Sequence, residues 1–131
     1  MACNSSTDVS IAALASLNRH QALWQQRTFS SYSFDLVQEK FGMTSNVHVT
    51  VNGTTIVSVI DNTTGEPPVV DAGYPTIDGL FAMAQAEFAQ HSSMLRMEFN
   101  EQYGYPTLVD INSINPAGPY SAAVSNLAPT E

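Results

Sequence analysis

One stretch of the sequence decides the fold: residues 47–54, Val-His-Val-Thr-Val-Asn-Gly-Thr. Valine at every second position predicts a strand with one apolar face, because successive side chains of a strand point to opposite faces. Asn52-Gly53 predicts a type I′ hairpin turn, which needs positive φ at both central residues. We therefore expect a second strand, Thr54 to Asp61, to fold back on the first, with Val49 opposite Ile56.

Two further elements are predicted before this hairpin. Apolar residues three or four positions apart predict a helix over residues 8–27, with Trp24 as the anchor of its buried stripe. Alternation of apolar and polar residues from Tyr32 to Val37 predicts the first strand. After the hairpin, residues 62–73 are rich in Thr, Gly and Pro and are expected to form a loop.

The second half of the chain has the same order of patterns. Thr76 is a suitable N-cap, and apolar residues from Ile77 to Phe88 recur on one helical face. Three strands are expected to follow, around residues 95–100, 109–112 and 120–127, and the last of them is short and weak in pattern. Because the links between successive strands are short, neighbouring strands should be antiparallel.

These elements together predict an α+β fold of two layers. An antiparallel sheet of five to six strands is expected to carry both helices on one face, in the order α-βββ-α-βββ. A chain of 131 residues has the usual size of one domain. We expect that single domain over residues 8–131, preceded by a flexible tether over residues 1–7.

Composition excludes several classes of function. Twelve acidic and four basic residues give a net charge of −8, so nucleic acid is excluded as a partner because its phosphates would be repelled. No apolar run approaches the roughly 20 residues that a membrane-spanning helix needs. A single cysteine allows neither an internal disulfide nor a multi-cysteine metal site, and no pattern indicates a cofactor.

The position of that cysteine is informative. The chain begins Met1-Ala2-Cys3-Asn4-Ser5-Ser6, which resembles the start of a mature bacterial lipoprotein, where the signal peptide is cut just before a lipid-bearing cysteine. This interpretation makes Cys3 the lipid attachment site and the only membrane contact. Asn4, in place of Asp, favours the outer membrane, so the expected location is periplasmic or outer-membrane-associated. The alternative is an ordinary N-terminus with a stray cysteine.

Several short motifs occur in one order along the chain and resemble a known family. They are Leu23-Trp24, residues 31–34, residues 49–53, Pro-Thr-Ile-Asp-Gly-Leu-Phe at 75–81, and Gly-Tyr-Pro-Thr at 104–107 before a strand with Asp110. The pattern is similar to an uncharacterised bacterial domain of unknown function found in secreted proteins and lipoproteins, over about residues 17–128.

This resemblance implies an exported domain and supplies no activity, substrate or cofactor. Many members of the family have a close pair of cysteines after the first strand. Residues 40–44 of this chain read Lys-Phe-Gly-Met-Thr at that place, so any role tied to those cysteines is absent.

Residues capable of catalysis do not form a recognisable constellation in the sequence. His20, His48 and His91 show no ligand spacing, and no nucleophile lies beside a base. Glu98 and Asp110 lie on neighbouring predicted strands and offer an alternative function, a small hydrolase acting on a saccharide through paired carboxylates. Carboxylates that alternate with apolar residues are equally typical of the wet face of an antiparallel sheet.

The candidate binding surface is aromatic. Tyr103 and Tyr105 flank Gly104, Tyr74 lies on a second loop, and we add Asp110 from the neighbouring strand. Tyrosines on stiff turns lose little entropy on binding, although the same rings could instead fold back and close the ends of the sheet. The preferred function is a non-enzymatic exported domain that binds a protein, a peptide or a cell-envelope component. The alternatives are the hydrolase and a structural spacer domain.

Overall fold

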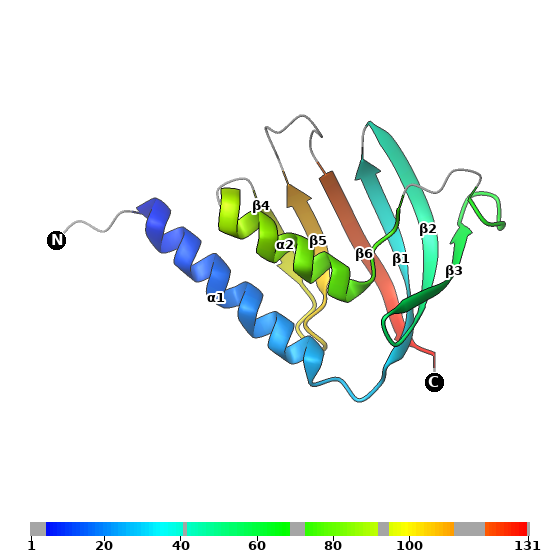
Figure 1. Ribbon diagram of the computed structural model, residues 1–131, viewed down its shortest axis with the longest axis horizontal. Coiled ribbons are helices and arrows are strands. Elements are labelled where there is room, and N and C mark those ends of the chain that lie inside the picture. Colours follow the sequence, from blue (N-terminus) through cyan, green and yellow to red (C-terminus); the bar gives the residue numbers. More distant parts are fainter. Residues whose placement is uncertain (1–4, 41, 69–72, 92–94, 112–119, 131) are drawn as a thin grey trace.

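The computed structural model describes residues 5–40, 42–68, 73–91, 95–111 and 120–130. Along the chain the elements are α1 (Ser5–Gln25), β1 (Ser31–Lys40), β2 (Met43–Asn52), β3 (Thr55–Asp61), α2 (Ile77–His91), β4 (Leu95–Phe99), β5 (Pro106–Ile111) and β6 (Tyr120–Pro129). The strands form one antiparallel sheet in the order β3-β2-β1-β6-β5-β4, and both helices lie against one face (Figure 1). The predicted α+β architecture is confirmed.

The last strand differs from its expectation. We expected a short, weak strand, but β6 spans ten residues and pairs with both β1 and β5. Its sequence is dominated by small residues, which have little intrinsic strand preference. Position in a sheet often outweighs that preference, and hydrogen bonds along both sides of β6 join the two halves of the chain.

The β2–β3 turn also differs from the prediction. Asn52 pairs with Thr55, so the two loop residues are Gly53 and Thr54. Gly53 has φ 67°, whereas the only described non-glycine residue with positive φ is Asn126. Positive φ at the first loop residue alone is the pattern of a type II′ turn, with glycine at the position where a Cβ would be strained. The prediction therefore placed the turn one residue too early and gave it type I′ in place of type II′.

The register of the β2–β3 hairpin also differs from the prediction. Val51 pairs with Ile56, and Val49 pairs with Val59 rather than with Ile56 as expected. Between these pairs β3 advances by three residues while β2 advances by two, so Val57 is an extra residue in a β-bulge. Its side chain is 58% exposed.

Both helices start and end close to the expected residues. At the N-terminus of α2, Thr76 Oγ1 accepts a hydrogen bond of 2.9 Å from the Gly79 amide, which confirms the predicted cap. Helix α1 begins at Ser5 and ends at Gln25, against an expected span of 8–27. No helix in the described ranges is long and apolar enough to cross a membrane.

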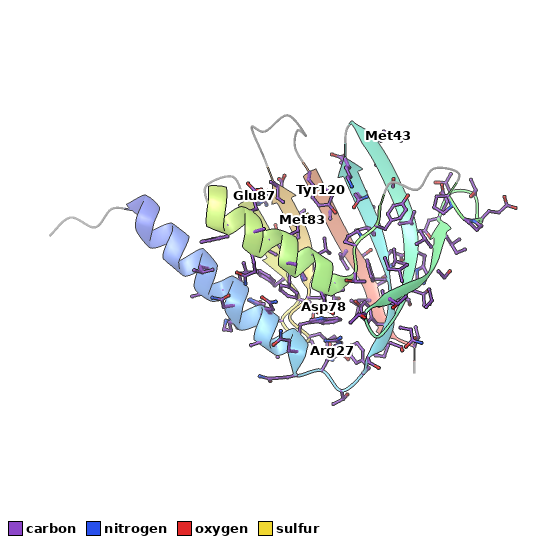
Figure 2. The ribbon with its side chains drawn as sticks, viewed as in Figure 1. Arg27, Met43, Asp78, Met83, Glu87 and Tyr120 are labelled. Carbon is purple, nitrogen blue, oxygen red and sulfur yellow. The ribbon has the colours of Figure 1, made fainter. Side chains whose placement is uncertain are left out.

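An aromatic cluster forms the core beneath the end of α1. Trp24 is fully buried, its ring meets Tyr32 edge to face at 5.1 Å, and its Nε1 donates to Asp78 at 3.1 Å. Tyr32 accepts a hydrogen bond from the Ile77 amide, and burial raises its pKa to about 12. The guanidinium of Arg27 lies 4.0 Å from the Trp24 ring, at the same end of the molecule as Asp78 (Figure 2). Helix α1, strand β1 and helix α2 therefore meet at one point.

The turn between β4 and β5 packs directly on the backbone of α1. Gly104 has φ 86°, and a Cβ there would overlap the carbonyl oxygen of His20 and lie 2.9 Å from the Leu23 Cβ and 3.0 Å from the Trp24 amide. Glycine is therefore needed at this position for two reasons: its positive φ, and the close approach of the turn to the backbone of α1.

We predict that Gly104→Ala lowers the free energy of unfolding by roughly 3 kcal/mol or more, because a left-handed backbone angle costs about 1–2 kcal/mol and the overlap with α1 adds to it. Urea unfolding measures the loss. The matched control is Gly65→Ala, where φ is 76° and no atom lies within 4 Å. That variant should lose only roughly 1 kcal/mol, and equal losses in the two variants would show that the contact with α1 is unimportant.

Candidate functional site

One face of the sheet is not covered by either helix, and we call it the open face. Its side chains alternate along each strand with those of the core. They include Ser33, Asp35, Val37 and Glu39 of β1, Asn46, His48 and Thr50 of β2, Leu108 and Asp110 of β5, and Ser121, Ala123 and Ser125 of β6. All of these are at least partly exposed, and small polar residues predominate.

A polar cluster around Asp35 occupies one part of this face. Asp35 Oδ1 accepts hydrogen bonds from His48 Nδ1 at 2.9 Å and Asn62 Nδ2 at 3.2 Å, and Oδ2 accepts one from Asn126 Nδ2 at 2.8 Å. Asn62 Nδ2 also lies 3.0 Å from Asn46 Oδ1. One carboxylate thus connects β1, β2, β6 and the turn after β3.

A bulge in β6 brings Asn126 into this cluster. The pairing of β1 with β6 shifts between Ser33 and Asp35, where β6 has one extra residue, and Asn126 has φ 55°. Asparagine tolerates this left-handed region better than most residues. Nothing in the local sequence marks the bulge, so the cluster was missed by sequence reasoning.

The hydrogen bonds set the protonation of Asp35. Burial alone would raise the pKa of its carboxyl group, but the donors Asn126, His48 and Asn62 outweigh burial and lower that pKa. The hydrogen bond from Nδ1 to Asp35 orients the His48 imidazole, and many catalytic sites contain an imidazole that a carboxylate orients in this way. Both Asp35 oxygens are already occupied by side-chain donors, and no group of three metal-ligating side chains occurs among the described residues. The arrangement primarily braces the sheet.

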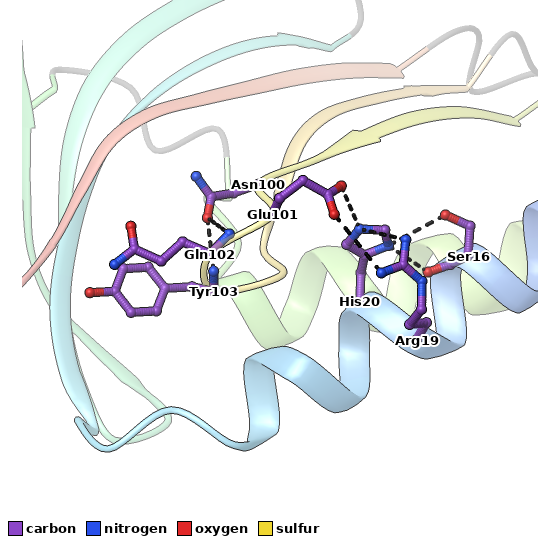
Figure 3. A network of polar contacts seen from close by, with 7 residues as sticks. All are labelled: Ser16, Arg19, His20, Asn100, Glu101, Gln102 and Tyr103. Atoms are coloured by element: carbon purple, nitrogen blue, oxygen red, sulfur yellow. Dashed lines mark hydrogen bonds and ion pairs between the residues drawn. The ribbon is translucent and has the colours of Figure 1, made fainter.

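A second polar network joins α1 to the turn between β4 and β5 (Figure 3). His20 is 2% exposed, its Nδ1 lies 2.7 Å from the Ser16 carbonyl oxygen, and its Nε2 lies 2.9 Å from Glu101 Oε2. The imidazole stacks on Phe99 with centroids 4.2 Å apart. The hydrogen bond from His20 lowers the pKa of Glu101. Like the Asp35 cluster, this network ties elements together.

The same turn determines where two of the predicted tyrosines lie. Asn100 Oδ1 accepts hydrogen bonds from the amides of Gln102 and Tyr103, at 2.9 and 2.8 Å, which gives the turn a fixed shape (Figure 3). Tyr105 is only 7% exposed and faces Trp24 at 6.2 Å. The ring of Tyr103 meets Phe29 edge to face at 5.3 Å.

The tyrosines therefore do not form the exposed aromatic surface that we expected. Tyr74 is also half-buried and packs against the core, as Tyr103 does. Large aromatic rings gain more from burial than from exposure, so the alternative expectation, in which the rings fold back, describes their placement. Of the four predicted binding residues, Asp110 alone lies on the open face.

Asp110 lines a hollow at one end of the open face. The hollow has a volume of about 270 Å³ and is lined by Glu39, Lys40, Gly42, Thr44, Asp110, Tyr120 and Ser121. These residues come from β1, β2, β5, β6 and the β1–β2 turn, so four strands and one turn contribute to it. Tyr120 lies at the end of β6 (Figure 2), and its hydroxyl donates to Gln38 Oε1 at 2.6 Å.

The carboxylate pair of the hydrolase hypothesis is only partly brought together. Arg96 pairs with Asp110 and Glu98 with Leu108, so Glu98 and Asp110 do lie on adjacent strands and on one face. Glu98 is 57% exposed, lies 3.0 Å from the Arg96 guanidinium and does not line the hollow. The lipid attachment predicted at Cys3 lies outside the described residues.

The sheet with its two helices and single open face defines the class of this protein, a two-layer α+β domain. The chain belongs to the family of unknown function DUF6174, whose family model matches residues 16–126. This match confirms the resemblance to a domain-of-unknown-function family, over nearly the range expected from the sequence. No curated protein matches the chain.

We predict that Asn126→Gly raises the pKa of Asp35, because the change removes one of three donors and keeps a residue that accepts positive φ. A lowered pKa in the folded state gives stability that is present above the unfolded pKa and is lost as pH falls through the folded pKa. In the variant the Asp35 carboxylate should therefore contribute less stability at neutral pH, and the loss of stability on acidification should be smaller. NMR titration of the Asp35 carboxyl carbon measures the change.

Asn46→Ala is the control for this titration, since Asn46 contacts Asn62 but not Asp35. Its Asp35 pKa should stay below the ordinary value. An unchanged Asp35 pKa in Asn126→Gly would contradict the role assigned to the bulge.

Proposed function

We propose that this chain is a non-enzymatic, exported binding domain, anchored by lipid on Cys3, whose open face binds a protein, a peptide or a cell-envelope component. The proposed location is the periplasm or the periplasmic side of the outer membrane of a bacterium. Support comes from the uncovered face of the sheet and from the lipoprotein-like sequence at Cys3 and Asn4.

The observation that carries the binding proposal is an apolar stripe in the middle of the open face. Val37 pairs with Ala123, which in turn pairs with Leu108, so three neighbouring strands each contribute one apolar side chain. Val37 is 40% exposed. Polar rows lie on both sides of the stripe, and an apolar centre with a polar rim is typical of protein interfaces.

Rigidity of this face also supports binding. Strands β1 and β6 are paired on both sides, and the Asp35 cluster links them to β2. A surface that is already ordered loses little conformational entropy when a partner binds.

The position of α1 is compatible with a lipid anchor. The helix begins at Ser5, one residue after Asn4, and its first turns extend past the sheet (Figure 1). These first turns would hold the sheet away from a membrane that carries the lipid on Cys3.

The binding proposal predicts the loss of a partner when the stripe is made charged. In affinity capture from a bacterial envelope extract, Val37→Arg/Ala123→Arg should fail to retain a partner that the original protein retains, because the charges would be desolvated at the interface. Ala82→Arg, at an exposed position of α2, is the control and should retain it. Identical captures with all three proteins would refute the open face as the binding surface.

The anchor proposal predicts acylation at Cys3. When the chain is produced in a Gram-negative bacterium behind a lipoprotein signal peptide, mass spectrometry should find cleavage before Cys3 and an added lipid mass. Cys3→Ser should abolish both changes, because serine offers no thiol to the lipid-transfer reaction. A processed protein with an unmodified Cys3 thiol would exclude the lipid anchor.

A further inference from the structure

We infer that the partner is a cationic polypeptide segment, which places a lysine or arginine side chain in the hollow and neighbouring apolar side chains on the stripe. This inference rests on the proposed function and names the chemistry of its partner. It depends on three features of the hollow: its two carboxylates, the absence of ion pairs between them and other described residues, and its position next to the stripe.

Two carboxylates lie on opposite sides of the hollow. Ser121 of β6 pairs with Glu39 of β1 on one side and with Asp110 of β5 on the other. All three side chains point to the open face, and the Cα atoms of Glu39 and Asp110 are two strand spacings apart, about 10 Å. A cationic group above Ser121 would lie between both carboxylates.

Nearby cations of the chain are directed elsewhere. Arg96 pairs with Asp110 across the strands, but its guanidinium donates to Glu98 at 3.0 Å. Lys40 is among the lining residues, but its side chain alternates with that of Glu39, and its Nζ lies 3.6 Å from the position that a Cβ on Gly73 would take. Within the described part of the chain, Glu39 and Asp110 make no ion pair, so their charges remain available to a partner.

The rest of the lining suits a donor with several N–H groups. Thr44 and Ser121 supply hydroxyl oxygens to the hollow, whereas the Tyr120 hydroxyl lies on the core side of the sheet and donates to the buried Gln38. Hydroxyl and carboxylate oxygens accept hydrogen bonds from ammonium and guanidinium groups, which have no acceptor of their own. With a net charge of −8, the chain also attracts cationic partners at a distance.

The hollow and the apolar stripe are continuous. Glu39, Ser121 and Asp110 form one row across the sheet, and Val37, Ala123 and Leu108 form the next row on the same face. Side chains two residues apart on a strand lie about 7 Å from each other. An extended segment that carries a basic and an apolar side chain two residues apart matches this spacing, because such side chains lie on one face of an extended chain. A purely hydrophilic polycation does not match it.

The test is an NMR titration with the acetylated, amidated pentapeptide Val-Ala-Lys-Ala-Val, whose valines lie on the same face as the lysine when the peptide is extended. We expect the amide signals of Ser121, Asp110 and Val37 to shift. The same peptide with norleucine in place of lysine keeps the aliphatic stem and removes the charge, and it should bind at least about tenfold more weakly. Raising the salt concentration from about 50 to 300 mM should weaken binding of the lysine peptide only.

Protein variants locate the effect. Glu39→Gln/Asp110→Asn should weaken binding of the lysine peptide at least about tenfold, with an otherwise unchanged amide spectrum. Glu66→Gln removes an exposed charge on the turn beyond β3 and should bind like the original protein. Equal affinity for the two peptides, or no loss in Glu39→Gln/Asp110→Asn, would overturn the inference.

Failure of this inference can be separated from failure of the proposed function. A captured partner that is lost with Val37→Arg/Ala123→Arg but retained with Glu39→Gln/Asp110→Asn would keep the open face as the binding surface and reject the cationic partner. A partner retained with both double variants would reject the inference and the proposed function together.

Discussion

The contact of Trp24 with Tyr32 and Asp78 is the interaction on which the rest of the structure depends. It joins the end of α1 to the first strand and to the first turn of α2, and the Trp24 and Tyr32 side chains are fully buried. With both helices fixed on one side, the sheet is left with an uncovered second face. The rigidity of that face comes from the pairing of its strands and from the Asp35 cluster.

Periodicity in the sequence predicted most of the fold, for reasons that are local. Alternation in β1 and β2 and the helical spacing that ends at Trp24 each reflect the face that an element buries, and burial dominates stability. Register and bulges were not predictable in the same way. The extra residues at Val57 and Asn126 depend on which strands become neighbours, and the small residues of β6 form a strand because β1 and β5 lie beside it.

The candidate site was predictable only in part. Asp110 could be placed on the wet face of a strand from alternation alone, and it does line the hollow. Glu39 attracted no attention in the sequence, because its relation to Asp110 arises only when β6 lies between β1 and β5. The tyrosines were misplaced because stiffness of their loops says nothing about the direction of the rings, and Gly104 lets that turn approach α1 closely enough to bury Tyr105.

The bulge at Val57 has a consequence for how molecules of this protein meet one another. Strand β3 is at an edge of the sheet, where unpaired backbone groups can recruit a strand from another molecule and begin aggregation. An extra residue interrupts the regular spacing of those groups and increases the local twist. A second chain therefore finds a poor template along β3, and the bulge protects this edge of the sheet against pairing with another molecule.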